Sequence, residues 1–220
     1  RESEYRDWFD LQKHFALRYA DLPELLLRYN PHIVHFSGHG SPTGELIFSD
    51  DAGKKHLIPP ELLADLFDVL RDNIRCVVLN ACYSDTQAEG IARSIDCVVG
   101  MTRAVPDEAA RRFASSFYTG LGYGRSVANA FKLGRINMGV YVAGEETTPK
   151  LLDPNNKAAS IVFAGIRPPA VQPPAVQPAG AQNSPANLAA PATSEGGTSP
   201  AAGAATAAPL VLVVTVRLYA

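Results

Sequence analysis

The strongest constraint on the fold is a repeated alternation of short apolar runs with amphipathic segments. Ile33–Phe36, the run RCVVLNAC at Arg75–Cys82 and CVVGM at Cys97–Met101 have the pattern of strands buried on both faces of a sheet. Helical spacing is found in residues 61–70, 86–95, 107–121 and 126–131. Strands alternating with helices in this way predict an α/β fold, in which helices cover both faces of a mostly parallel central sheet.

Two more helices and a hairpin are predicted before the second strand. Residues 1–20 place Trp8, Leu11 and Phe15 near helical spacing, which predicts one amphipathic helix. A second, short helix is expected from Asp21, because an Asp-Leu-Pro-Glu start favours a helix N-terminus. Residues 45–58 contain two strand-like pieces around a turn with glycine, as in a small hairpin.

The composition changes near Ile166, which divides the chain into three predicted parts. Residues 1–165 form the predicted folded domain. Nine of the 17 prolines follow Ile166, and Glu195 is the only charged residue between Pro168 and Pro209, so residues 166–208 are expected to form a disordered Pro/Ala-rich linker. Residues 209–220 are β-branched and strand-like, and we expect them to begin a following, truncated domain. The missing initiating Met and the abrupt end predict a piece of a longer chain.

Composition excludes several classes of function. The 20 Lys and Arg residues are nearly balanced by 22 Asp and Glu residues, without the basic stripe typical of nucleic-acid binding. The three cysteines form no CxxC pair, which argues against a zinc site or a disulfide framework and favours the reducing cytoplasm. No apolar run is long enough to span a membrane. We expect no metal and no other cofactor.

Two strands end in residues suited to nucleophilic catalysis. The first runs out through Ser37-Gly38 to His39, and the second runs out to Cys82. Adjacent parallel strands would hold these ends side by side, and a Cys beside a His is the minimal pair for acyl transfer. Ser84 and Thr86 both begin capping-box patterns, so the positive end of a helix would favour the Cys82 thiolate. The backbone N–H groups of Gly40 and Cys82 are candidates for an oxyanion hole.

The remaining cysteines and histidines of these strands have a structural interpretation. We expect Cys76 and Cys97 to be buried, since free cysteine is among the most buried residue types. His32 and His35 are interpreted as packing residues. The His35 and His39 pair has the spacing of a helical zinc motif, but the Ser-Gly between them breaks a helix.

The residues HFSGHG at 35–40 and NACYS at 80–84 resemble the motifs of caspase-like cysteine peptidases, and most closely those of bacterial CHAT domains. Residues 95–134 are also similar to that family. The resemblance implies a three-layer α/β sandwich, Cys82 as the nucleophile, His39 as its activating residue or proton donor, and cleavage of a peptide bond in a protein substrate. It also implies a sensor or repeat domain, in the same or an associated chain, that switches the peptidase on.

The sequence departs from the family at three points, one of which is a poor match after Gly139. The other two concern the fold and the candidate site. The family places a strand before the opening helix, so the sheet here is expected to lack its first strand. In relatives the residue two before the nucleophile lines the first specificity pocket, where Asp suits a basic substrate residue. Here it is Asn80, which is neutral, and Ser37 and Asp85 are further candidates for that pocket.

Two other functions are compatible with the sequence. A catalytically silent interaction module would keep the fold and recruit a partner through its surface. A flavodoxin-like nucleotide binder would need a phosphate loop, whereas SGHGSPTG leads into the predicted hairpin.

Overall fold

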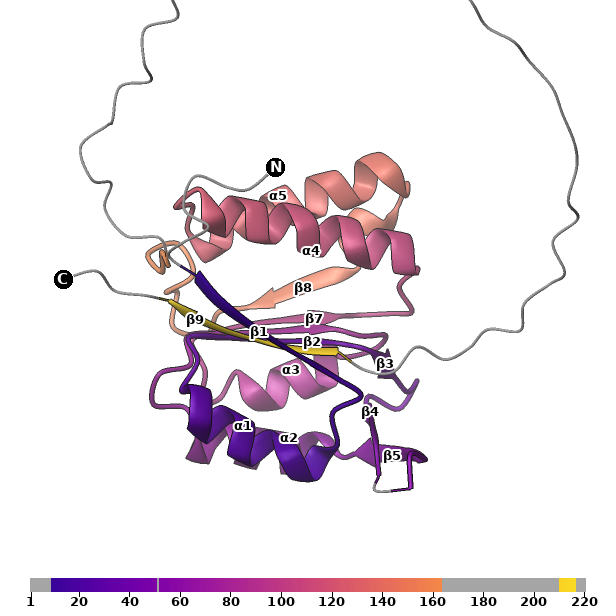
Figure 1. Cartoon of the computed structure of the whole chain (residues 1–220). Helices are drawn as coiled ribbons and strands as arrows, with labels where there is room; N and C mark the ends of the chain where they lie inside the picture. The colour runs from indigo at the N-terminus through magenta and orange to yellow at the C-terminus, as the bar shows by residue number, and fades with distance from the viewer. Residues whose placement is uncertain (1–8, 51, 164–209, 217–220) are drawn as a thin grey trace, which may run out of the picture. The chain divides into compact units, whose positions relative to one another are not determined.

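The computed structural model describes residues 9–50, 52–163 and 210–216, the last range by its backbone. Its centre is a six-stranded sheet with the order β1-β9-β2-β6-β7-β8 (Figure 1). The strands are β1 (Phe9–Phe15), β2 (Ile33–Ser37), β6 (Cys76–Asn80), β7 (Cys97–Met101), β8 (Pro149–Leu152) and β9 (Leu210–Val216). β2, β6 and β7 pair in parallel, while β9 and β8 run the other way. The predicted α/β fold with a mostly parallel sheet is confirmed.

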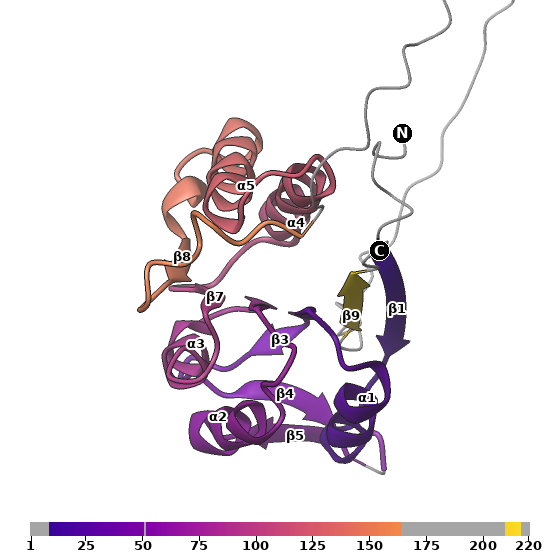
Figure 2. The ribbon, with the colours of Figure 1, turned by 90° about the vertical axis from the view of Figure 1, so that its left-hand side faces the viewer.

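Helices cover both faces of this sheet and produce three layers (Figure 2). One face carries α1 (Leu22–Tyr29), α2 (Pro60–Val69) and α3 (Asp85–Ile91), and the other carries α4 (Asp107–Gly122) and α5 (Val127–Tyr141). Side chains of β6 alternate between the two cores. Val77 and Leu79 pack with the first group, and Cys76 and Val78 with the second. All five residues of β6 are buried, which explains why its sequence is apolar without alternation.

A small second sheet follows β2 directly. It consists of β3 (His39–Gly40), β4 (Leu46–Ser49) and β5 (Lys55–Ile58). β4 and β5 pair antiparallel, so the predicted hairpin is confirmed. The turn between β3 and β4 lies against α3, since a Cβ added to Gly44 would come within 3.0 Å of the Thr86 Cβ. Two short 3-10 helices, η2 (Tyr19–Asp21) and η3 (Glu145–Thr147), complete the described elements.

The predicted opening helix is wrong where the structure describes it. Phe9–Phe15 forms strand β1 at the edge of the sheet, and residues 1–8 lie outside the described residues. The run FDLQKHF also fits a two-residue period, because Phe9, Leu11 and Phe15 share one side of a strand. Pairing with β9 decides between the two patterns. The expectation that the sheet lacks its first strand is therefore also wrong.

The C-terminal strand differs from its expected place. Residues 209–220 were predicted to begin another domain, but Leu210–Val216 lies between β1 and β2 and pairs antiparallel with both. Leu210 lies opposite Ser37, and Val214 lies opposite Ile33. The linker predicted for residues 166–208 lies outside the described residues.

Candidate active site

The pairing of β2 with β6 brings the two predicted catalytic segments to one edge of the sheet. Ser37 and Asn80 are register partners at the ends of these strands. The Gly38 N–H extends the pairing by donating to the Asn80 carbonyl at 3.4 Å. His39 lies two residues after Ser37, and Cys82 lies two residues after Asn80. Both segments therefore leave the sheet at the same place. This is the arrangement expected for sites in open parallel sheets.

Gly40 lies directly on the backbone of Cys82. A Cβ added at Gly40 would come within 1.9 Å of the Cys82 carbonyl oxygen and 3.0 Å of its carbon. Both contacts are to backbone atoms, which cannot rotate away. The lack of a side chain at Gly40 is therefore required for the His39 segment to pack this closely on the Cys82 segment.

Cys82 is the only one of the three cysteines that is not fully buried. Its sulfur accepts a hydrogen bond from the Val105 N–H at 3.4 Å and lies 3.9 Å from the Val105 carbonyl oxygen. Burial raises the pKa of Cys97 to about 12 and raises that of Cys76 well above its usual value. Cys76 and Cys97 therefore remain protonated in the core, as expected, and Cys82 is the cysteine available for chemistry.

The turn after Cys82 is held by buried hydrogen bonds. Tyr83 has a φ of 53°, a left-handed conformation that is uncommon for a residue with a side chain, and such residues cluster at functional sites. Its N–H donates to the Arg103 carbonyl at 3.3 Å. The fully buried Ser84 hydroxyl donates to the Leu79 carbonyl at 2.8 Å and accepts from the Met101 N–H at 3.0 Å. These contacts tie the turn to the ends of β6 and β7.

The predicted capping box at Ser84 is wrong. α3 does begin three residues after Cys82, but the Ser84 side chain makes no hydrogen bond to the helix N-terminus, because its oxygen is already used by Leu79 and Met101.

Sequence reasoning also missed the loop that carries Val105. Nothing in the exposed residues 102–104 marks it locally as part of a site.

Comparison with known proteins agrees with the two motifs. The sequence model of the CHAT domain matches residues 11–139, more than half of the chain. The chain belongs to the CHAT domain family. It is similar to a protein named Roc-COR-CHAT protease, from an unknown prokaryotic organism, with 30% identity over 104 residues, or 44% of this chain and 10% of that protein. A probable protease of Gillisia limnaea is 27% identical over 161 residues, or 69% of this chain and 27% of the relative. The chain thus spans far less than two thirds of either relative.

In this CHAT domain, Asn80 and Ser37 lie together on the α4 side of the sheet. Asn80 is 6% exposed, and its Nδ2 donates to the Ala110 carbonyl in α4 at 3.2 Å. Its Oδ1 is buried without a hydrogen-bond partner among the described residues. Asp85 belongs to α3 on the opposite face. The pKa of Lys150 is raised mainly by the hydrogen bond that its Nζ donates to the Glu89 carboxylate, and the charge of Asp85 adds to this. The structure therefore pairs two of the three candidate pocket residues.

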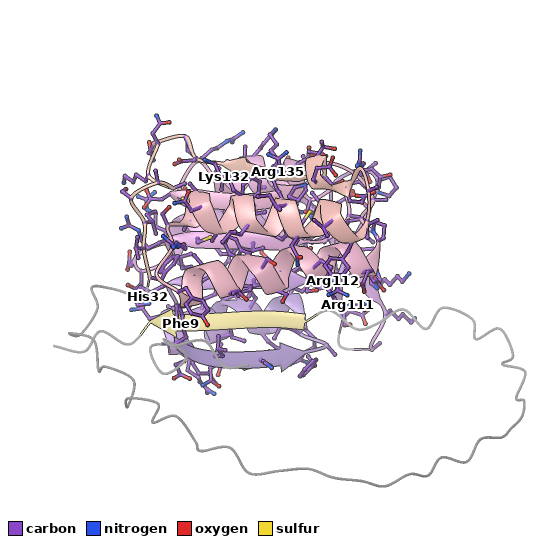
Figure 3. All side chains as sticks on the ribbon, turned by 90° about the horizontal axis from the view of Figure 1, so that it is seen from above. Phe9, His32, Arg111, Arg112, Lys132 and Arg135 are labelled. Carbon is purple, nitrogen blue, oxygen red and sulfur yellow. The ribbon has the colours of Figure 1, made fainter. Side chains whose placement is uncertain are left out.

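His32 and His35 occupy positions consistent with structural roles. His35 is 4% exposed and shares a 2.8 Å hydrogen bond through Nδ1 with the Tyr118 hydroxyl of α4. His32 precedes β2, and Figure 3 shows it at the opposite end of the molecule from Arg111 and Arg112 in α4. Burial lowers the pKa of His32, and the charge of Arg75 acts in the same direction. Neither histidine belongs to the edge where Cys82 lies.

Acidification is expected to destabilise this domain through His35. Burial lowers the pKa of His35 to about 4, against 6.5 for the free side chain. Its stabilising contribution is therefore fully present above pH 6.5 and is lost as the pH falls toward 4, because the unfolded chain takes up the proton first. The expected loss in the free energy of unfolding between pH 7 and pH 5 is about 2 kcal/mol.

Urea unfolding at these two pH values measures the effect. A His35→Gln variant keeps a hydrogen-bonding group for Tyr118 but does not titrate, so its loss of stability at pH 5 should be smaller by that amount. An equal loss in both proteins would assign the acid sensitivity to other groups.

The described part of the chain offers no membrane-spanning element, as none of its helices is both long and apolar enough. Within the same residues, no cluster of three or more His, Cys, Asp or Glu side chains is arranged to hold a metal ion.

Proposed function

We propose that this CHAT domain is a caspase-like cysteine endopeptidase that hydrolyses peptide bonds through Cys82 and His39. The observation that carries the proposal is the contact of Gly40 with the Cys82 backbone, which holds the segment of His39 against the one cysteine that is not buried. The names of the two relatives, both proteases, support the same class of reaction.

The proposed reaction uses groups at this edge of the sheet. His39 takes the proton of the Cys82 thiol, and the thiolate attacks the carbonyl carbon of the substrate. His39 then gives that proton to the leaving amine as the C–N bond breaks, which leaves a thioester on Cys82. Water, deprotonated by His39, hydrolyses the thioester and restores the thiol.

Backbone N–H groups are proposed to stabilise the oxyanion of both steps. The Cys82 N–H donates no hydrogen bond to any described residue, whereas the Tyr83 N–H is already used by the Arg103 carbonyl. The Cys82 N–H is therefore the donor that a substrate oxygen can take, with the Gly40 N–H from the facing loop as the second.

Asn80 and Ser37 are proposed to shape the pocket for the substrate residue before the cleaved bond. The buried Asn80 Oδ1 lacks a partner, and a buried acceptor of this kind favours a ligand that donates a hydrogen bond to it. Neither residue is charged, so these two residues supply no carboxylate that would select Arg or Lys. Asp85, on the other face of the sheet, is a weaker candidate for this role.

The setting of the peptidase is also proposed. The Roc-COR-CHAT relative is far longer than its matched segment, and by its name it carries other domains. We propose that a sensor or repeat domain, in the same or an associated chain, controls this domain as well. The register partners Cys76 and Cys97 lie on adjacent strands as free thiols, which favours a reducing, cytoplasmic location.

A peptide probe that carries a thiol-reactive electrophile tests the proposal. The wild type should be labelled, Cys82→Ala should not, and His39→Ala should be labelled roughly 100-fold or more slowly, as expected for loss of a general base. His56→Ala, which removes an exposed histidine of β5, is the matched control and should react like the wild type. Equal labelling of wild type and Cys82→Ala, or no labelling of the wild type, contradicts the proposal.

A further inference from the structure

The loop between β7 and α4 closes over the sulfur of Cys82. Within this loop, the Val105 N–H is the donor that reaches Sγ, at 3.4 Å. Pro106 follows Val105, and a residue before proline is restricted to extended backbone conformations, which limits how this N–H can turn. A hydrogen bond from an N–H to sulfur is stronger when the sulfur is a negatively charged thiolate than when it is a thiol. The position of this loop therefore bears on the reactivity of Cys82.

Two residues at the start of the loop attach it to the turn around η3. The Arg103 Nη2 donates to the Gly144 carbonyl at 2.6 Å and lies 3.6 Å from the Glu145 carboxylate. Thr102 donates to the Thr148 carbonyl from its N–H at 3.0 Å and from its hydroxyl at 3.1 Å. The Glu145 carboxylate also accepts from the Thr148 hydroxyl at 2.6 Å. The loop is thus fixed from one side by a connected set of hydrogen bonds.

The turn around η3 is itself attached to helix α5. The Arg135 Nε, in α5, donates to the Glu146 carbonyl at 2.6 Å. A continuous series of contacts therefore runs from α5 through the turn to Arg103, and from the loop to the sulfur of Cys82.

Arg103 also holds the residue after Cys82. Its carbonyl oxygen accepts from the N–H of Tyr83, whose φ of 53° is costly for a residue with a side chain. The side chain of Arg103 fixes the loop, and its backbone fixes the turn of the nucleophile. Among the described residues, no other residue of this loop is hydrogen-bonded both to the turn around η3 and to the residue that follows Cys82.

We propose that Arg103 is a positioning residue, which holds the Val105 N–H on the Cys82 sulfur and so favours the thiolate. This rests on the proposed function in treating Cys82 as the nucleophile. Arg103 acts through the loop, since the contacts of its side chain are to Gly144 and Glu145. Its ion pair is long and half exposed, and such pairs add little to stability. Removing the side chain should therefore alter the reactivity of Cys82 more than the stability of the fold.

Alkylation of the intact protein by iodoacetamide across a pH series tests this without a substrate. Mass spectrometry of the peptide that contains Cys82 gives the rate, and the buried Cys76 and Cys97 report any unfolding by becoming reactive. In Arg103→Ala the midpoint of the pH–rate profile should move up by about one pH unit, and the rate at neutral pH should fall about tenfold. The plateau at high pH should stay near that of the wild type, because the thiolate itself still reacts.

Two further variants separate positioning from a general loss of charge or structure. Arg103→Lys keeps a donor and the charge, so its profile should lie between wild type and Arg103→Ala. Lys132→Ala removes an exposed cation of α5, the helix that also carries Arg135 (Figure 3). This variant should leave the pH–rate profile unchanged. A profile for Arg103→Ala equal to that of the wild type overturns the proposal.

A double-mutant cycle identifies the path of the effect. Val105→Pro removes the N–H that contacts Sγ and should shift the profile by about as much as Arg103→Ala. The double variant should shift no further, because both changes remove the same hydrogen bond. Additive shifts, or no shift in Val105→Pro, overturn the proposal. The alkylation test is independent of the peptide-probe test. Even if no peptide probe labels Cys82, the alkylation rates show whether Arg103 and Val105 affect its reactivity.

Discussion

Replacing Gly40 by Ala is expected to slow the labelling of Cys82 by a peptide probe about 100-fold or more. The added Cβ would come within 1.9 Å of the Cys82 carbonyl oxygen, well inside the contact distance of the two atoms. Since the neighbouring atoms are backbone, relief requires the His39 segment and the Cys82 segment to move apart by more than about 1 Å. Misplacement of that size costs about 100-fold or more in rate. The crowding should also lower the free energy of unfolding by about 1 to 3 kcal/mol.

Probe labelling and urea unfolding of the same Gly40→Ala protein measure the two effects. Gly53→Ala in the β4–β5 hairpin is the matched control, because a Cβ there meets no atom within 4 Å although the φ of 72° is strained for Ala. It should lose about 1 kcal/mol of stability and keep the wild-type rate of labelling. Wild-type labelling of Gly40→Ala would show that the two loops are not held by this contact.

The edge of the sheet that carries the candidate site could be predicted because it depends on local patterns. β2 and β6 each contain a run of mostly apolar residues without polar alternation, so each was identifiable as a buried strand from its own residues. Helices between strands imply parallel pairing, and parallel pairing places both C-terminal ends together. His39 and Cys82 follow those ends directly, so the meeting of their two segments could be expected without knowledge of distant contacts.

The outer part of the sheet could not be predicted, because it depends on contacts between segments that are far apart in the sequence. FDLQKHF is compatible with a helix or a strand, and its pairing partner β9 lies at the other end of the sequence. Ser84 fits a capping box, yet the buried carbonyl of Leu79 and N–H of Met101 compete for its hydroxyl more effectively than the helix does. Arg103 sits in an exposed loop, and only its contacts in space connect it with Cys82.

Removal of β9 is expected to have a second large effect, this time on the whole sheet. A chain that ends at Thr206 lacks the strand through which β1 joins the sheet, and β2 keeps its pairing with β6 but loses its partner on the other side along Ile33–Ser37. The lost hydrogen bonds and packing should lower the free energy of unfolding by roughly 5 kcal/mol, comparable with the stability of many domains. An open strand edge also promotes aggregation.

Thermal unfolding and size-exclusion chromatography of the full and shortened chains measure this loss. A peptide of residues 208–220 added to the shortened chain should restore the unfolding midpoint, because the gap between β1 and β2 accepts one antiparallel strand. The same peptide with Val213→Pro should fail, since proline cannot donate to the ladder at a position that lies opposite both Gln12 and Val34. Because Leu210 pairs with Ser37, just before the His39 segment, probe labelling of Cys82 should fall and recover together with the unfolding midpoint. An unchanged midpoint in the shortened chain would place β9 outside the cooperative fold and remove this link between the C-terminal strand and the site.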